Sequence, residues 1–242
     1  MRVIAIIQAR MTSTRLPGKV MMEVGGKPLL GYELERAARA KRLSGIVVAT
    51  TTNATDDIVA RFAESCGVGV YRGPEDDVLE RYHGAAAAFG AEAVVRLTAD
   101  CPLIDPDLID SVVSALLDAQ EPVDYTSNVL ERRTYPRGLD AEAFTRDALE
   151  RTWREAKAPF EREHVTPYIY NHPEIFKLEG VYGDRDLSRH RWTVDTPEDF
   201  ELIRTLLEQL YPVNPTFSFE DIVRLMDDNP GLFDINCHIR QK

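Results

Sequence analysis

Buried-strand patterns alternate with amphipathic-helix patterns along the first half of this sequence, and that alternation restricts the possible folds more than any other feature. Short apolar runs typical of buried strands occupy 3–7, 45–50, 67–71 and 93–99. Apolar residues at helical spacing occupy 28–40, 56–66, 76–89 and 105–120. The alternation predicts an α/β fold with βαβ units and a mainly parallel sheet flanked by helices. Ligands of such sheets usually bind beyond the carboxyl ends of the strands.

The helix predicted at 105–120 has both a start signal and an apolar stripe. Asp105 is a suitable N-cap, and Pro106 suits the first turn because its missing N–H is not needed there. The stripe consists of Leu108, Ile109, Val112, Val113 and Leu116. We therefore expect one face of this helix to be buried.

The pattern changes after Asp124. Residues 125–144 are irregular or β-like, and the remaining elements are predicted at 145–157 (helix), 175–182 and 190–194 (strands) and 196–211 (helix). The last helix should bury Phe200, Ile203, Leu207 and Leu210. No linker rich in Gly, Ser or Pro divides the chain, so we expect a single domain over 1–242 with an inserted lobe at about 125–185.

The charge balance and the cysteine pattern exclude several classes of function. The chain has 40 Asp and Glu against 29 Lys and Arg, a formal net charge of −11, which argues against nucleic acid as a partner because a polyphosphate backbone needs a broad basic surface. The apolar runs are far shorter than the roughly 20 residues of a membrane-spanning helix, so no membrane partner is expected. The first run is also too short for a signal peptide. Three widely spaced cysteines without a zinc-ligand pattern fit a cytoplasmic protein best.

One loop breaks the acidic character of the chain. The segment QARMTSTRLPGK at 8–19 carries Arg10, Arg15 and Lys19, and the first 22 residues contain no Asp or Glu. The loop follows the first predicted strand, where an α/β sheet binds its ligand, and Gly18 permits a close approach of the backbone. Its hydroxyl donors are Thr12, Ser13 and Thr14. Backbone N–H groups together with these cations make a site suited to a polyphosphate.

Two common phosphate-binding motifs are absent from this loop. It keeps only the final Gly-Lys pair of the G-x-x-x-x-G-K-[ST] motif, and it lacks the G-x-G-x-x-G of a dinucleotide site. The alternative interpretation is a structural loop whose cations pair with acidic residues of the surface.

The loop and the segments after it resemble a known family. ARMTSTRLPGKVMMEVGGKPLL at 9–30 is similar to the N-terminal signature of the sugar-acid cytidylyltransferases, the CMP-Kdo and CMP-sialic acid synthetases, and in particular to the spore-coat polysaccharide biosynthesis protein F group of that superfamily. Further segments typical of that group follow in order at 71–82, 96–106, 135–144, 162–170, 191–203 and 229–242. The resemblance implies a nucleotide-diphospho-sugar transferase (Rossmann-like) fold, with an inserted lobe for dimerisation and acceptor binding, and a homodimer.

The same resemblance implies a nucleotide site around the basic loop. Contacts with CTP are implied for Ala9, Arg10, Met11, Ser13, Arg15, Lys19, Arg72 and Thr98. Arg10, Lys19 and Asp100 would carry the catalysis. Arg72 follows the third predicted strand, near the place where family members recognise the base. Thr98 departs from the CMP-Kdo synthetases, which have Gln at that position.

Asp100 and Asp195 are the implied ligands of a Mg²⁺ cofactor. Nucleotidyl transfer concentrates negative charge on the α-phosphate and on the departing pyrophosphate, so cations and Mg²⁺ placed there lower the barrier. Mg²⁺ usually takes one or two carboxylates and keeps waters and phosphate oxygens as its other ligands. For Asp195 the alternative is a purely structural N-cap of the helix predicted at 196–211.

The predicted acceptor site lies in the inserted lobe. Its residues are Arg137, Asp140, Glu142, Arg162, Glu163 and His164. The two arginines suit bidentate contacts with a carboxylate or phosphate. Asp140 and Glu142 stand two residues apart, so on a strand they would share one face and could hold hydroxyls or an amine. The alternative is a lobe held by salt bridges, or a dimer contact.

The predicted activity is that of a Mg²⁺-dependent cytidylyltransferase in polysaccharide biosynthesis. An acceptor oxygen would attack the α-phosphate of CTP, giving a CMP-conjugate and pyrophosphate. The acceptor would be a sugar acid, a sugar phosphate or a phosphonate. Two alternatives stay open: a nucleotide-sugar-dependent glycosyltransferase of the same fold, and a non-catalytic nucleotide-binding regulator.

Overall fold

A computed structural model describes residues 1–240 of the chain, and within them seven strands form one sheet. The strands are β1 (Val3–Gln8), β4 (Gly45–Thr51), β5 (Gly69–Gly73), β6 (Ala93–Thr98), β7 (Tyr125–Ser127), β8 (Glu142–Thr145) and β9 (Leu178–Gly180). Their order across the sheet is β5–β4–β1–β6–β8–β7–β9. Strand β8 runs antiparallel to β6 and β7, whereas every other neighbouring pair is parallel. The mainly parallel sheet predicted from the sequence is confirmed.

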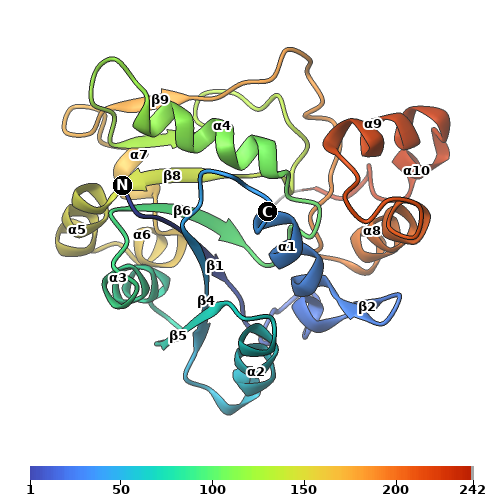
Figure 1. Cartoon of the computed structure of the whole chain (residues 1–242), viewed down its shortest axis with the longest axis horizontal. Helices are drawn as coiled ribbons and strands as arrows, with labels where there is room; N and C mark the ends of the chain where they lie inside the picture. The colour runs from blue at the N-terminus through green and yellow to red at the C-terminus, as the bar shows by residue number, and fades with distance from the viewer. Residues whose placement is uncertain (241–242) are drawn as a thin grey trace.

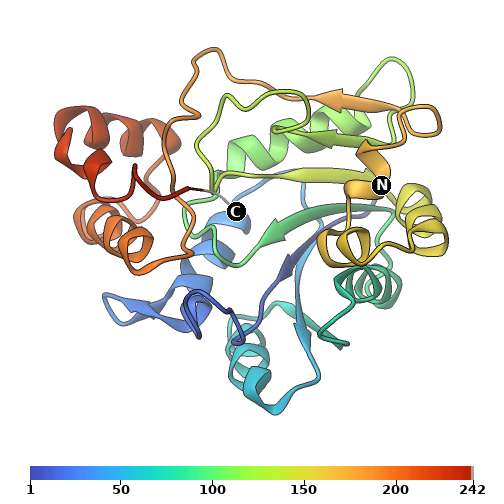
Figure 2. The ribbon, with the colours of Figure 1, turned by 180° about the vertical axis from the view of Figure 1, so that it is seen from behind.

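Helices cover both faces of the sheet (Figures 1 and 2). One face carries α1 (Leu29–Ala37), α2 (Asp57–Ser65) and α4 (Pro106–Leu117). The other carries α3 (Val78–Ala88), α5 (Arg146–Glu155), α6 (Pro159–His164) and α7 (Pro167–Tyr170). Alternate residues of β1 pack into the two cores, with Ile4 and Ile6 on the α3 side. A strand buried on both faces explains the continuous apolar run at 3–7.

Helix α4 forms as its sequence predicts. The carboxylate of Asp105 accepts hydrogen bonds from the backbone N–H groups of Asp107 and Leu108, both at 3.0 Å, and Pro106 opens the helix. The predicted stripe from Leu108 to Leu116 is buried. Asp105 thereby satisfies N–H groups that have no partner inside the helix.

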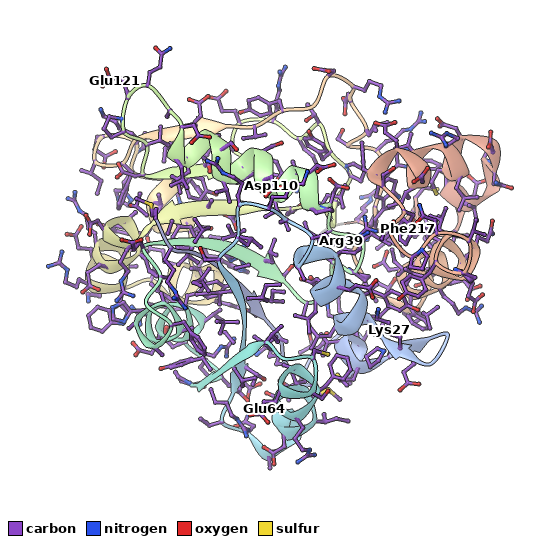
Figure 3. The ribbon with its side chains drawn as sticks, viewed as in Figure 1. Lys27, Arg39, Glu64, Asp110, Glu121 and Phe217 are labelled. Carbon is purple, nitrogen blue, oxygen red and sulfur yellow. The ribbon has the colours of Figure 1, made fainter. Side chains whose placement is uncertain are left out.

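A C-terminal unit of three helices lies beyond the carboxyl end of β6 (Figure 1). It consists of α8 (Pro197–Leu210), α9 (Phe219–Asp228) and α10 (Gly231–Asp234). The buried apolar residues of α8 are Leu202, Ile203, Leu206 and Leu207. The expectation that Phe200 and Leu210 are buried is wrong, because both are only partly covered at the edge of the core. Phe217, which is labelled in Figure 3, joins this unit to α1, because the guanidinium carbon of Arg36 lies 4.3 Å from its ring centroid.

The strand predicted at 190–194 is not a strand. Apart from a single bridge between Arg137 and Arg191, this segment pairs with irregular loops: Trp192 donates to the carbonyl of Arg137, and Val194 to that of Asp100. The predicted alternation is nevertheless present, because Trp192 and Val194 enter the core. Gly138 makes this packing possible, since a Cβ at its φ of +100° would lie 2.4 Å from the backbone nitrogen of Thr193.

The segment predicted as an inserted lobe, 125–185, contributes β7, β8 and β9 to the main sheet and α5, α6 and α7 to one of its faces. The strand predicted at 175–182 shortens to β9, and the one predicted at 67–71 shifts to β5. Among the described residues, no helix is both long and apolar enough to cross a membrane. The final two residues of the motif at 229–242, Gln241 and Lys242, lie outside the described residues.

Candidate active site

The basic loop turns back on itself directly after β1. The backbone N–H of Gly18 donates to the carbonyl of Met11 at 2.8 Å, and Gly18 adopts a left-handed φ of +74° that favours glycine. The loop then enters a short 3₁₀ helix, η1 (Lys19–Met21), and the hairpin of β2 (Glu23–Val24) and β3 (Lys27–Pro28). Asp56, at the end of the 3₁₀ helix η2 (Ala54–Asp56), holds the Met11 N–H at 2.7 Å. Asp56 therefore anchors the loop to the neighbouring strand connection.

Lys19 lies between the two predicted metal ligands. Its Nζ is 2.7 Å from Oδ2 of Asp100, which follows β6, and 2.8 Å from Oδ1 of Asp195, which precedes α8. Burial lowers the pKa of Lys19, but the charges of the two carboxylates outweigh burial and raise it above its usual value. Burial likewise raises the pKa of Asp100, and Lys19 with the Thr98 hydroxyl outweighs that effect and lowers it. Both groups are therefore charged at neutral pH.

The other two cations of the loop also meet carboxylates. A terminal nitrogen of Arg15 lies 2.8 Å from Oδ1 of Asp195, so Arg15 and Lys19 share one oxygen. Arg10 lies 3.3 Å from Glu75, which also accepts from the Thr12 hydroxyl. All three cations thus pair with acids, but two of them pair with an acid of the site itself rather than with the surface.

Asp195 is not the N-cap of α8. The cap is Thr196, whose hydroxyl accepts from the N–H of Asp199 at 3.3 Å, while Asp199 accepts in return from the N–H of Thr196 at 3.1 Å. This capping box leaves the carboxylate of Asp195 free to face Lys19 and Arg15. Its second oxygen accepts from Arg191 at 2.8 Å. The alternative of a structural cap at Asp195 is therefore wrong.

A cavity of about 460 Å³ opens beside the start of the loop. It is lined by Gln8, Ala9, Arg10, Glu75, Asp76, Val78, Arg81, Pro159, Glu163 and His164. Ala9 and Arg10 were predicted to contact the nucleotide, whereas Glu163 and His164 were predicted to contact the acceptor. The structure brings these two groups of residues into one cavity, at the carboxyl end of β1.

Other predicted nucleotide contacts are engaged within the protein. Arg72 donates to the carbonyls of Thr51 and Asn53, both at 2.8 Å, and pairs with Asp57 at 2.7 Å. The hydroxyl of Thr98 donates to Oδ1 of Asp100 at 2.7 Å, which orients this carboxylate. The roles of Arg72, Thr98 and Ser13 in binding the nucleotide stay predictions.

The predicted acceptor residues separate into different surroundings. Asp140 precedes β8 and forms a two-bond pair with Arg133, whereas Glu142 is buried within β8 against Arg96, Tyr125 and Thr166. The two acids therefore do not share a strand face as expected. Arg162 pairs with Asp77, the N-cap of α3. These contacts match the alternative of a salt-bridged lobe.

Arg137 differs from the other acceptor candidates. Among residues 1–240 it forms no ion pair, and it lies near Arg133, Asp140 and Arg191. Burial, followed by the charge of Arg133, lowers its pKa. Arg133 and Arg191 already pair with carboxylates, so within residues 1–240 Arg137 is the guanidinium of this group that is left to bind an anion.

The donor chemistry at Lys19 fits Mg²⁺. Asp100 and Asp195 both direct one oxygen to the Lys19 ammonium, and Mg²⁺ prefers such carboxylate oxygens. Within the described part of the chain no three His, Cys, Asp or Glu side chains gather as a metal cluster. The protein could thus supply two carboxylates, and the remaining ligands would be water and substrate oxygens.

Two acidic residues of the site were missed in the sequence. Glu75 stands two residues after β5, the position at which parallel strands present site residues, and this was a usable signal. Glu33 is fully buried in α1, and among residues 1–240 neither of its carboxylate oxygens has a hydrogen-bond partner. Burial, followed by the charge of Asp100, raises its pKa well above the usual range, and the nearby N–H of Cys101 offsets this only partly. Its position in an apolar helix face carried no signal of this environment.

Comparison with known proteins places the chain in a family. The sequence model of the family described as Cytidylyltransferase matches residues 4–218. The spore coat polysaccharide biosynthesis protein SpsF of Bacillus subtilis is 33% identical over 235 residues, which cover 94% of this chain and 95% of that protein. An uncharacterized protein of Methanocaldococcus jannaschii is 39% identical over 244 residues, covering 100% and 97%.

Solved structures agree with this assignment. A cytidylyltransferase from Leptospira borgpetersenii superposes with a TM-score of 0.92 at 36% identity, covering 100% of this chain and 99% of that one. A CMP:2-keto-3-deoxy-manno-octonic acid synthetase complexed with CTP shares the fold, with a TM-score of 0.65 at 20% identity over 86% of this chain and 99% of that one. The chain therefore belongs to the cytidylyltransferase family, and it is a nucleotidyltransferase of Rossmann-like fold.

Proposed function

We propose that the protein is a Mg²⁺-dependent cytidylyltransferase that couples CTP to a sugar acid, a sugar phosphate or a phosphonate and releases pyrophosphate. The observation that carries this proposal is the meeting of Arg15, Lys19, Asp100 and Asp195 at one edge of the sheet. A cluster of two cations and two carboxylates matches a reaction in which phosphate charge and metal charge must be balanced together.

The basic loop would bind the triphosphate. Arg10, Arg15 and Lys19 neutralise the charge that grows on the departing pyrophosphate, and each exchanges its present carboxylate partner for a phosphate oxygen. Asp100 and Asp195 would hold Mg²⁺, which supplies Lewis-acid stabilisation of the phosphate oxygens when it is bound. The Thr98 hydroxyl keeps Asp100 oriented toward the site.

The acceptor would be anionic. Of the two acceptor arginines, Arg162 pairs with Asp77, whereas Arg137 has no carboxylate partner among residues 1–240, so its half-buried guanidinium is available to a negatively charged group. A carboxylate or phosphate on the acceptor satisfies this requirement, and a planar carboxylate can take two parallel N–H bonds from a guanidinium. A sugar acid is the simplest such acceptor.

A glycosyltransferase of the same fold receives less support from these residues. Such enzymes commonly hold a metal on an intact nucleotide sugar through a D-x-D motif after a central strand. Here Asp100 is flanked by Thr98 and Pro102, so the motif is incomplete. Position 98, where a D-x-D motif would place its first Asp, is a Thr whose hydroxyl donates to Asp100.

The test is isotope tracing from α-labelled CTP with a panel of anionic acceptors and Mg²⁺. We expect label in a CMP-conjugate, release of pyrophosphate, and poorer reaction with other nucleoside triphosphates. Asp100→Asn serves as the inactive control. Sugar transfer from an intact nucleotide sugar without pyrophosphate release would contradict the proposal and favour the glycosyltransferase. Nucleotide binding without turnover for any acceptor would favour a regulator.

A further inference from the structure

The C-terminal segment inserts one polar side chain into the charge network of the site. Within residues 229–240, Asn236 is the buried residue, with 2% of its surface exposed, while Phe233 and Ile235 beside it are only partly buried. Burial of an amide in preference to apolar neighbours is unfavourable unless its hydrogen bonds are satisfied. The position of Asn236 therefore calls for a specific set of partners.

Those partners belong to the pair that supports Asp195. The side-chain nitrogen of Asn236 donates to Oδ1 of Asp199 and to the backbone carbonyl of Arg191, both at 2.9 Å. Arg191 in turn donates to both oxygens of Asp199, at 2.8 and 3.0 Å, and to Oδ2 of Asp195 at 2.8 Å. Asp199 is fully buried and Arg191 nearly so.

We propose that Asn236 is a positioning residue that fixes Asp195 through Arg191 and Asp199. Its two N–H bonds hold the main chain of Arg191 and one oxygen of Asp199 at the same time. In this arrangement the guanidinium of Arg191 reaches both Asp199 and Asp195. The C-terminal segment thus completes a site whose other parts come from the loop after β1, the end of β6 and the start of α8.

Loss of Asn236 removes one of the bonds that orient this pair. Among residues 1–240, Oδ1 of Asp199 would then keep Arg191 as its partner, while Oδ2 stays held by the backbone N–H groups of Asp195 and Thr196. The carboxylate could therefore pivot about Oδ2 and let Arg191 release Oδ2 of Asp195. Asp195 would then keep Arg15 and Lys19 on its first oxygen, while its second oxygen lost the orientation that a metal ion needs. This reasoning rests on the proposed function, in which Asp195 holds Mg²⁺.

The test compares Asn236→Ala with Asn229→Ala. Asn229 lies in the same segment and is exposed, and within the described part of the chain its side chain donates to the carbonyl of Leu225 at 3.0 Å and to nothing else, so it is a matched control. We expect Asn236→Ala to lower kcat by about 10-fold, the lower end of the effect of removing a side chain that touches a metal ligand, because Asn236 reaches Asp195 through Arg191 and Asp199. The KM for CTP should change much less than kcat, and Asn229→Ala should resemble the wild type.

Two further variants separate positioning from simple stability. Asn236→Asp keeps the shape but places a carboxylate beside Asp199, so it should be at least as impaired as Asn236→Ala. Asn236→Ser keeps one donor and should recover part of the loss, and it replaces Asn236→Ala if that variant does not fold. Equal kcat per folded molecule in the variant used and in Asn229→Ala would overturn the inference.

Failure of the proposed function can be told apart from failure of this inference. If the wild type shows no turnover with any acceptor, the proposed function fails, and titration calorimetry of CTP with and without Mg²⁺ becomes the readout for Asn236. A weaker effect of Mg²⁺ on CTP binding in Asn236→Ala than in Asn229→Ala supports the positioning role. Identical binding in the two variants overturns it.

Discussion

The Nζ of Lys19 lies 2.8 Å from the carboxylate of Asp195, although 176 residues separate the two in the chain. Asp100 approaches the same ammonium at 2.7 Å. All three side chains are largely shielded from water, so their charges interact more strongly than they would at the surface. One ion cluster therefore joins the basic loop after β1, the end of β6 and the start of α8.

Replacement of Lys19 should impair both catalysis and stability. We expect Lys19→Ala to lose about 100-fold or more in turnover, because it removes a preorganised charge from the reacting phosphates. It also removes the ammonium from Asp100, while Asp195 keeps Arg15 and Arg191, so the loss should be about 1–3 kcal/mol of unfolding free energy. Turnover and thermal unfolding of the same preparation measure the two effects.

The metal provides an independent check on this variant. In Lys19→Ala, Mg²⁺ should raise the thermal midpoint more than in the wild type, because the cation can take the place of the ammonium between the two carboxylates. Lys27→Ala is the control, since Lys27 pairs with Glu35 outside the cluster. Normal turnover in Lys19→Ala would remove the loop lysine from the mechanism.

The two carboxylates at Lys19 should both affect the dependence on Mg²⁺. Asp100→Asn should abolish turnover or sharply raise the Mg²⁺ concentration required, because an amide lacks the charge that a hard cation prefers. Asp195→Asn should raise the requirement as well. Thr196→Ala is the matched control: it removes the cap of α8, costs about 1 kcal/mol of stability, and should leave the metal dependence unchanged. If Asp195→Asn behaves as Thr196→Ala does, Asp195 is not a metal ligand.

Glu75 should compete with the nucleotide for the basic loop. Its carboxylate accepts from Thr12 and Asn53, which together with the charge of Arg10 lower its pKa, so it is ionised at neutral pH. Because Glu75→Gln weakens its hold on Arg10, the Kd for CTP should fall by about two- to five-fold, the scale of an exposed ion pair. Asp76→Asn is the control. It removes the same charge from the same cavity, but among residues 1–240 Asp76 forms no ion pair with a cation of the basic loop, so CTP binding should change less. Weaker CTP binding in Glu75→Gln would show that Glu75 holds the nucleotide instead.

Glu33 should make the protein less stable as the pH rises. Burial raises its folded-state pKa above the unfolded value of about 4.3, so the folded state binds the extra proton between those two values. Unfolding free energy therefore falls as the pH increases through that interval and levels off above the folded-state pKa. Glu33→Met should remove this slope and add about 1–3 kcal/mol near neutral pH, because no unpaired carboxyl remains buried.

Urea unfolding from pH 4 to pH 8 tests this expectation about Glu33. Wild type and Glu33→Met should converge at acid pH and diverge toward neutral pH. Glu64→Gln, a change at an exposed position of α2, should follow the wild type throughout (Figure 3). Parallel curves for the wild type and Glu33→Met would mean that Glu33 is ionised and paired in the folded state.

The fold and the location of the site followed from local features of the chain. Continuous apolar runs require strands buried on both faces, and amphipathic segments between them require covering helices. The cap at Asp105 and the turn at Gly18 depend on neighbouring residues, so they too could be predicted. The segment 190–194 shows the limit of this approach. Its alternation is real, but its hydrogen-bond partners at Arg137 and Asp100 lie in irregular loops, so no continuous ladder forms and the segment is not a strand.

The sequence by itself determined that a basic loop follows the first strand and that acids stand at the ends of later elements. Only the tertiary structure decided which charges meet. Lys19 with Asp195, Arg10 with Glu75, and Asn236 with Asp199 are pairs formed by chain segments far apart in sequence. The isolation of Glu33 is also a tertiary property, since burial depends on what packs around α1. The local sequence pattern reflects the conformational preferences of the backbone and the spacing of apolar residues. Electrostatic pairing and desolvation depend instead on neighbouring residues that the tertiary fold brings together.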